Sequence, residues 1–201
     1  MKKLAVFLLS ALVFMMCTEK KGRLYEVELK QAEEMKSGVR VENVFLDLKY
    51  GLSQSAVFSR FRQLAYQGVI DLGKGSVFEY TMKLDTQTVK AGFHTEFYHD
   101  SLYSFSLLLK GKNEAEAETL RQLMLKELKM KFGEPFVIPS EEDTTKRDFY
   151  FVKDNQRIEL LYPFQARKCA VTYVDYPMET RMIQEEMRLE KEAMKKNSQK
   201  K

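Results

Sequence analysis

The stretch VENVFLDLKYGLSQSAVFSRFRQLAYQG, residues 41–68, decides the fold. Its first part predicts a short strand over 44–48 that leads into a turn. Ser53 then suits a helix N-cap, because its hydroxyl can accept a hydrogen bond from an unpaired amide of the first turn. Apolar residues recur at helical spacing from Val57 onward, and Gly68 is placed to end the helix. We therefore expect one strand followed by one amphipathic helix.

Three segments after this helix alternate between apolar and polar residues with a period of two. They are SVFEYTMKL (76–84), TVKAGFHTEFYH (88–99) and SLYSFSLLL (101–109). In the last of them, the apolar face is expected to comprise Tyr103, Phe105, Leu107 and Leu109. Such alternation is typical of antiparallel strands with one buried and one solvated face. Short polar connections at 85–87 and 99–100 predict hairpins.

The same order then repeats along the chain. Asn113 and Glu116 form a capping-box-like helix start, and Gly133 followed by a proline ends that helix. Strands are expected over 149–152, 157–162 and 168–174. The predicted fold class is α+β: a two-layer sandwich of an antiparallel sheet with helices on one face. It would be built from tandem helix-plus-three-strand halves over 39–111 and 112–177, with an extra C-terminal helix and basic tail over 178–201.

The chain opens with two lysines and an apolar run that ends at Cys17. This run is too short to cross a hydrocarbon core, which needs about 20 apolar residues. Residues 1–16 resemble a bacterial lipoprotein signal peptide, and the resemblance implies that Cys17 is diacylated and becomes the N-terminus. Residues 17–38 are expected to form a polar tether with a short helix. No acidic run follows Cys17, which favours the periplasmic side of a bacterial membrane.

Charge and cysteine usage narrow the function further. The formal net charge of +4 includes two signal-peptide lysines. The remaining excess is too small for a nucleic-acid-binding footprint, so nucleic acid is not expected as a partner. Cys169 would be the sole cysteine besides Cys17, which leaves no internal disulfide. It alternates with apolar residues in KCAVTYV (168–174) and is expected to be a small buried core residue.

Candidate catalytic and metal-binding groups are sparse. His94 and Glu96 share a strand face, but His99 has the wrong parity to join them, and zinc needs three or four converging ligands. Glu79, Glu96 and Glu159 could act as paired carboxylates only across a cleft that the sequence does not indicate. We therefore predict no catalytic residues, no metal site and no cofactor, that is, a non-enzymatic protein.

One segment carries a family likeness. LKYGLSQSAVFSRFRQL, residues 48–64, resembles the start of the small outer-membrane-assembly lipoproteins of the BamE/SmpA type. The tandem helix-plus-sheet layout is also similar to the β-lactamase-inhibitor-protein fold. These resemblances imply an envelope protein that binds other proteins. They transfer no binding residue to this chain.

The leading hypothesis is a lipid-anchored protein-binding or assembly module of the cell envelope, with the membrane and an unidentified envelope protein as partners. Tyrosine and arginine are favoured interface anchors. The expected interaction surface on the solvated sheet face comprises Tyr98, Arg157, Lys90, His94, Glu96 and Glu159. Four methionines of the C-terminal helix, at 178, 182, 187 and 194, would either dock a partner or pack on the domain itself. The alternative function is a periplasmic carrier of a small apolar ligand or lipid.

Overall fold

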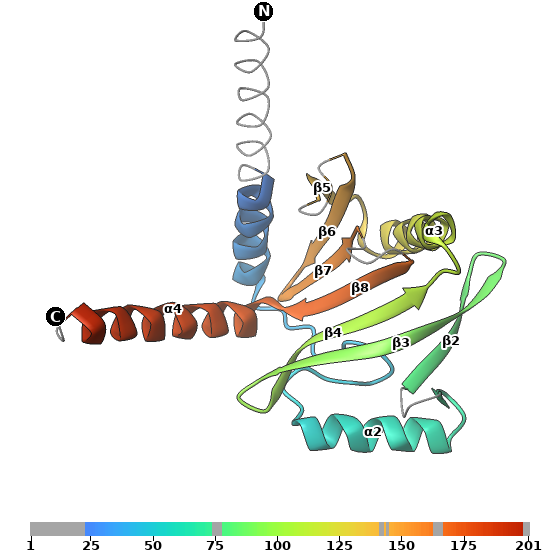
Figure 1. The fold of residues 1–201 in the computed structure, drawn as a ribbon, viewed down its shortest axis with the longest axis horizontal. Coiled ribbons are helices and arrows are strands. Elements are labelled where there is room, and N and C mark those ends of the chain that lie inside the picture. Colours follow the sequence, from blue (N-terminus) through green and yellow to red (C-terminus); the bar gives the residue numbers. More distant parts are fainter. Residues whose placement is uncertain (1–22, 74–77, 141–142, 144, 163–166, 199–201) are drawn as a thin grey trace, which may run out of the picture.

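The computed structural model describes residues 23–73, 78–140, 143, 145–162 and 167–198. Eight antiparallel strands form one sheet in the order β1-β2-β3-β4-β8-β7-β6-β5 (Figure 1). The predicted α+β sandwich with an antiparallel sheet is confirmed. Cys17 and the predicted signal peptide lie outside the described residues. Within those residues, no helix is both long enough and apolar enough to span a membrane.

Each half of the chain contributes a helix and four strands. The first half holds α2 (Gln54–Tyr66), β1 (Asp71–Leu72), β2 (Phe78–Leu84), β3 (Gln87–Tyr98) and β4 (Ser101–Lys110). The second half holds α3 (Glu114–Phe132), β5 (Phe136–Pro139), β6 (Arg147–Lys153), β7 (Gln156–Leu161) and β8 (Lys168–Asp175). The last strands of the two halves, β4 and β8, pair at the sheet centre. The prediction of three strands per half missed β1 and β5, which are too short to show an alternating pattern.

Helix α2 begins and ends where the sequence predicts. The Ser53 hydroxyl accepts a hydrogen bond from the Ala56 amide at 3.2 Å. Gly68 follows the helix with a φ of 70°, in the left-handed region that glycine tolerates best. The strand expected over 44–48 is wrong. The Val44 amide bonds to the carbonyl of Leu48 at 2.7 Å, so this segment closes into a tight turn instead.

The hydrophobic core fills the space between the helices and one face of the sheet. Phe61 of α2 and Leu128 of α3 are buried there, and both belong to the same cluster as the central strands β4 and β8. Cys169 of β8 is fully buried in it, as predicted. Burial raises the pKa of its thiol to about 12, so the sulfur stays protonated and unreactive at neutral pH.

A β-bulge moves Tyr103 out of this core. Glu96 lies opposite Ser104, but Phe97 lies opposite Leu102, so Tyr103 is an extra residue on β4. The insertion shifts the side-chain alternation by one. Tyr103 therefore turns to the other sheet face, where its hydroxyl donates to Glu96 Oε2 at 3.1 Å. The expectation that Tyr103 shares the apolar face of β4 is wrong for this reason.

The expected polar tether is folded from residue 23 onward. Residues 23–34 form a helix that packs on the second half of the domain. Gln31 is fully buried, and its side-chain amide donates to the Asp154 carbonyl at 2.8 Å. Glu34 accepts a hydrogen bond from the Asp154 amide at 3.2 Å. Arg23 donates to the carbonyl of Val137 on β5 at 3.0 Å. The folded domain thus begins before residue 39.

Candidate interaction surface

Helix α4 (Tyr176–Ser198) extends from the sheet at a corner set by buried polar groups. It follows β8 directly (Figure 1). Asp175 is fully buried and accepts hydrogen bonds from Asn155 and Arg40, both at 3.3 Å. The carbonyl of Asn155 accepts from the Tyr176 amide at 3.0 Å. Because the buried side chains of Asp175 and Asn155 satisfy each other, they fix the direction in which α4 leaves the domain.

The far face, defined here as the sheet face opposite α2 and α3, carries the first contact with α4. Arg157 of β7 bonds to Glu159 Oε1 at 2.6 Å and to Glu179 Oε1 of α4 at 2.7 Å. We call these three residues the arginine cluster. Their side chains are only 14–18% exposed. The guanidinium also lies 5.9 Å from the centre of the Tyr176 ring.

Burial sets the electrostatics of the arginine cluster. It raises the pKa of Glu159, and the opposing effect of Arg157 is smaller. Burial also disfavours the charge on Arg157, but the carboxylates of Glu159 and Glu179 outweigh it and raise the pKa of the guanidinium. The expectation that Arg157 and Glu159 lie open on the sheet face is therefore wrong. The start of α4 covers them, and the sequence pattern of β7 alone does not reveal that.

A second contact with α4 lies at the β3–β4 hairpin. The Tyr98 hydroxyl donates to Glu185 Oε2 of α4, and His99 Nε2 lies 2.8 Å from the same oxygen. Hydrogen bonds from Tyr98 and His99 lower the pKa of Glu185. The same contact raises the pKa of Tyr98. Tyr98 thus reaches the far side of the sheet as predicted, but it holds α4 in place. We call these three residues the hairpin cluster.

The remaining predicted surface residues lie open on β3. The side chains of Lys90, His94 and Glu96 are 58%, 57% and 47% exposed. His94 Nε2 is 3.5 Å from Glu96 Oε1. Strands β4 and β8 separate β3 from β7, so these residues do not form one patch with Arg157 and Glu159. Within the part of the chain that the structure describes, no three His, Cys, Asp or Glu side chains converge as metal ligands.

The last turns of α4, residues 187–198, extend beyond the hairpin cluster, and we call them the overhang (Figure 1). Met187, Leu189 and Met194 are 46%, 52% and 68% exposed. Met178 and Met182, nearer the sheet, are half-buried. The half-burial of Met178 and Met182 fits the alternative in which the methionines pack on the domain, whereas docking of a partner by Met187 and Met194 stays a prediction. The first two methionines lie where α4 meets the domain, and the last two face outward.

Sequence reasoning missed the two glutamates that attach α4 to the domain. Glu179 and Glu185 look like ordinary solvated positions in a helix rich in charge. Their partners, Arg157 and Tyr98, lie on different strands, and only the tertiary path of α4 brings them together. The sequence signal that was available was the methionine periodicity, which indicated a stripe without showing which part of it is covered.

Comparisons of the chain with protein-family models, with curated proteins and with solved structures gave no match. The function is therefore inferred from the surface itself.

Proposed function

We propose that this protein is a non-enzymatic, lipid-anchored component of a bacterial cell envelope that binds another protein through the overhang. The observation that carries this proposal is the exposure of Met187 and Met194, which lie seven residues apart on one side of a helix projecting from the domain. A helical segment this short is marginal in water without tertiary packing. An amphipathic helix normally covers its apolar side. A partner that covers the overhang would supply the missing packing.

The overhang also indicates the chemistry of its partner. Methionine side chains adapt to irregular apolar surfaces, and amphipathic helices commonly bind by laying their apolar side in a groove. Arg188, Lys191 and Lys195 recur at helical spacing next to the apolar residues. Basic residues in this position favour a groove with acidic groups along its rim. The proposed partner is a protein with an apolar, acid-rimmed groove.

The anchor proposal rests on the lipoprotein-like signal and on the position of the N-terminal helix. Arg23 is fixed to β5 through the Val137 carbonyl. Only residues 18–22 lie between Arg23 and Cys17. Six Cα–Cα steps of an extended chain reach about 20 Å. If Cys17 is acylated, the domain stays close to the membrane surface, on the periplasmic side in our proposal, and not at the end of a long tether.

Site-specific photo-cross-linking in intact cells tests the binding proposal. A photoreactive residue placed at Met187 or Met194 should cross-link to one protein species, whereas one at Lys196, on the opposite side of the helix, should not. The partner recovered must have an apolar groove with acidic neighbours, and Met187→Gln/Met194→Gln should lose it. Glutamine keeps the helix propensity of methionine, so the loss would report lost contact. Cross-links only to lipid, only to a second copy of the chain, or equally from both sides of the helix would overturn the proposal.

A separate experiment tests the anchor. Cys17→Ala should abolish incorporation of labelled fatty acid and release the protein from the membrane fraction. Two acyl chains hold a protein stably on a bilayer, and none would remain in the variant. Cys169→Ala is the control, since that buried cysteine should have no influence on labelling. A wild-type protein that takes up no fatty acid would overturn the anchor and leave the overhang proposal intact.

The alternative carrier function has one place in the structure that favours it. A surface hollow of about 370 Å³ lies between α3 and the sheet, with apolar walls that include Phe45, Met82 and Leu107. Charged residues Lys83, Glu127 and Lys131 also line it. Native mass spectrometry of protein purified from membranes tests this function. A stoichiometric apolar ligand that is lost in Met82→Glu would establish the carrier and count against a purely protein-binding role.

A further inference from the structure

The two edges of the sheet are protected in different ways. At the β5 edge, the carbonyl of Val137 already accepts a hydrogen bond from Arg23 at 3.0 Å, and Pro139 has no amide hydrogen to offer. Blocked edges of this kind are common, because unpaired backbone groups readily bind other strands. The opposite edge is formed by β1 and β2, and β1 is only 2 residues long. That edge therefore has much less cover than the β5 edge.

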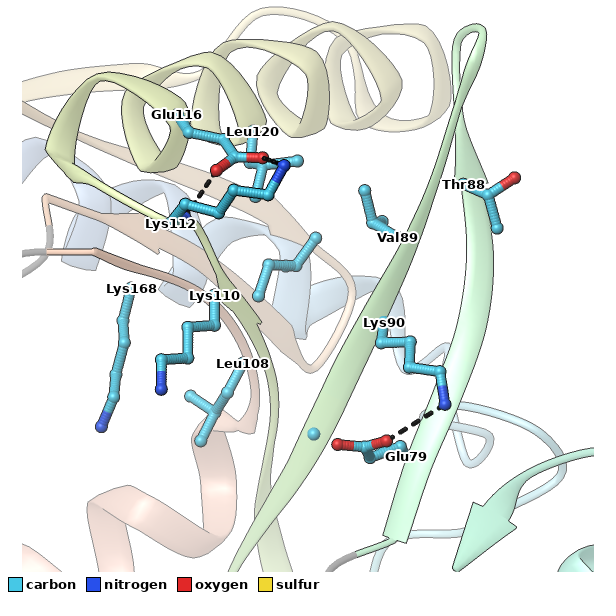
Figure 2. A pocket seen from close by; sticks show the side chains of 12 residues that line it. Glu79, Thr88, Val89, Lys90, Leu108, Lys110, Lys112, Glu116, Leu120 and Lys168 are labelled. Atoms are coloured by element: carbon cyan, nitrogen blue, oxygen red, sulfur yellow. Dashed lines mark hydrogen bonds and ion pairs between the residues drawn. The ribbon is translucent and has the colours of Figure 1, made fainter. Parts of the chain in front are cut away.

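Strand β1 covers only the beginning of β2. It pairs with Phe78 and Glu79. Glu79 also bonds to Lys90 of β3 at 3.4 Å (Figure 2). Residues 80–84 pair with β3 on one side and, among the residues that the structure describes, with no strand on the other. The second half of β2 is thus an open sheet edge.

The turn between β2 and β3 shows which backbone groups of this edge are open. Leu84 lies opposite Gln87, with two residues between them. In a hairpin of this length the flanking pair is hydrogen-bonded, and bonded pairs then alternate along the ladder. The amide and carbonyl groups of Thr81 and Lys83 therefore point away from β3. In the described part of the chain, these groups have no hydrogen-bond partner on the open side.

The hollow of about 370 Å³ between α3 and the sheet runs along this open edge. Met82, Lys83 and Leu84 all line it. Consecutive side chains of a strand point to opposite faces, so three consecutive residues line one hollow where it follows the edge of their strand. The facing wall is the end of α3, where Met130 is 67% exposed. We call this space between β2 and α3 the edge groove.

The charges of the edge groove indicate which side chains its occupant would carry. Glu127 and Lys131 both lie on α3, and their charges offset each other. Lys83 has no carboxylate partner among the described residues. Opposite charges that face each other across two strands stabilise the pairing. An acidic residue opposite Lys83 would supply that charge, and its neighbours on an added strand would point into the groove beside Met82.

We infer that the edge groove binds an extended segment of another protein as an additional strand of the sheet. Thr81 and Lys83 supply the backbone hydrogen bonds. An acidic residue of the segment lies opposite Lys83, and the apolar residues on either side of it fill the groove. A helix cannot make these bonds, because its own amides and carbonyls are already paired. Strand addition of this kind gains affinity from backbone bonds and specificity from pockets for alternate side chains.

This inference does not depend on the overhang or on the anchor. It assigns the hollow between α3 and the sheet a different occupant from the carrier alternative, since a small apolar ligand would leave the open backbone groups of Thr81 and Lys83 unpaired. The two occupants are therefore distinguished by whether binding depends on these backbone groups.

Selection of random decapeptides, displayed on phage, against the full chain in a neutral detergent tests the inference. Peptides with one acidic residue between two apolar residues should be enriched, and a synthetic copy should bind with one site per chain in isothermal titration calorimetry. N-methylation of the peptide at every second amide should abolish binding, because those amides face β2, whereas methylation of the intervening amides should not. Failure to enrich such peptides, or the same effect of methylation at every position, would overturn the inference.

Matched variants locate the peptide on the protein. Lys83→Glu should weaken its binding about tenfold, because attraction becomes repulsion, and a peptide with lysine in place of the acidic residue should then bind. Lys126→Glu makes the same charge change at an exposed position outside the groove and should have no effect. Thr81→Pro removes one open amide and should weaken binding, whereas Thr81→Val keeps that amide and should not. Thermal melting checks that each variant is folded.

Three results from these variants would overturn the inference. The first is equal weakening by Lys83→Glu and Lys126→Glu, which would indicate general attraction to a basic protein. The second is a dimer in analytical ultracentrifugation that Thr81→Pro dissociates, since the occupant would then be a second copy of the chain. The third is a copurified apolar ligand in the groove that the peptide does not displace.

Discussion

The two faces of the sheet are held in place by different kinds of interaction. The face under α2 and α3 is held by apolar side chains such as Phe61 and Leu128, which pack into one core cluster with the central strands. Helix α4 contacts the far face at the arginine cluster and at the hairpin cluster, and both contacts depend on charged side chains of α4. Hydrophobic burial is non-directional, whereas ion pairs fix particular positions.

This difference explains why the candidate interaction surface lies on the side of the far face. Away from these two contacts, His94 and Glu96 on β3 are exposed on this face. The same attachment lets α4 continue past the domain as the overhang. The apolar face has no such freedom, since moving either of its helices would expose the core. The variants below test how strongly each face contributes to stability, in descending order of expected effect.

The largest effect is expected on the core face. Phe61→Ala should lower the free energy of unfolding by about 3–5 kcal/mol, through lost transfer free energy and the cavity left behind. Phe58, on the same helix, is 38% exposed and provides the matched control. Phe58→Ala should have a clearly smaller effect. Urea unfolding followed by circular dichroism measures both. Equal losses for the two variants would show that α2 does not close the core as described.

An intermediate effect is expected at the arginine cluster. Arg157→Ala leaves Glu159 and Glu179 close together in a mostly covered site without their cation. Breaking a buried pair from one side typically costs 3–5 kcal/mol, and the partial exposure here reduces that to about 2 kcal/mol. Arg60, whose partner Asp47 is 82% exposed, supplies a surface-pair control. In urea unfolding, Arg60→Ala should lower the free energy of unfolding by at most about 1 kcal/mol. If Arg157→Ala is as mild as Arg60→Ala, then α4 does not cover β7.

The pKa of Glu159 predicts a pH effect of definite sign. Because its folded pKa lies above the usual value of 4.5, the folded protein holds the proton more tightly than the unfolded chain does. Its contribution to stability is therefore present below the unfolded pKa and is lost as pH rises through the folded pKa. Wild-type protein should gain stability relative to Glu159→Gln as pH falls toward about 4.5. Thermal melts over this pH range measure both proteins. If the stabilities of wild type and Glu159→Gln change in parallel with pH, the burial of Glu159 is contradicted.

A smaller, local effect is expected at the hairpin cluster. Glu185 has a lowered pKa, so its contribution is present above the usual carboxylate pKa and fades as pH falls through the folded value. Glu185→Gln should speed amide hydrogen exchange in the first turns of α4 while leaving global melting unchanged. Glu190→Gln, on the overhang, is the control and should alter neither. Unchanged exchange in both variants would mean that the hairpin cluster does not hold the helix.

Part of this architecture follows from the sequence because it is local. The Ser53 cap, the helical stripe that follows it and the period-two strands all express the chemistry of neighbouring residues. Residues that depend on distant partners could not be placed in the same way. The bulge at Tyr103 appears only when β4 is aligned with β3, since the insertion leaves no signal in the alternation itself.

The candidate sites depend even more on distant partners. Arg157 resembles a solvated strand residue until α4 brings Glu179 onto it. The pairing of β4 with β8, which joins the two halves at the sheet centre, is likewise specified by no local pattern. The exposed positions of His94 and Glu96, by contrast, follow directly from the parity of β3.

The smallest effect on stability is expected in the overhang. Ala193 is exposed, and glycine costs about 1 kcal/mol relative to alanine in a helix interior. Because the overhang can fray without exposing the core, Ala193→Gly should leave the global melting temperature unchanged. A partner that binds the overhang as a helix must first order it. The same substitution should then weaken that binding about fivefold, seen as lower photo-cross-linking from position 194 at limiting partner. A lowered melting temperature would instead show that the overhang packs on the domain, and the contrast between the two ends of α4 would fail.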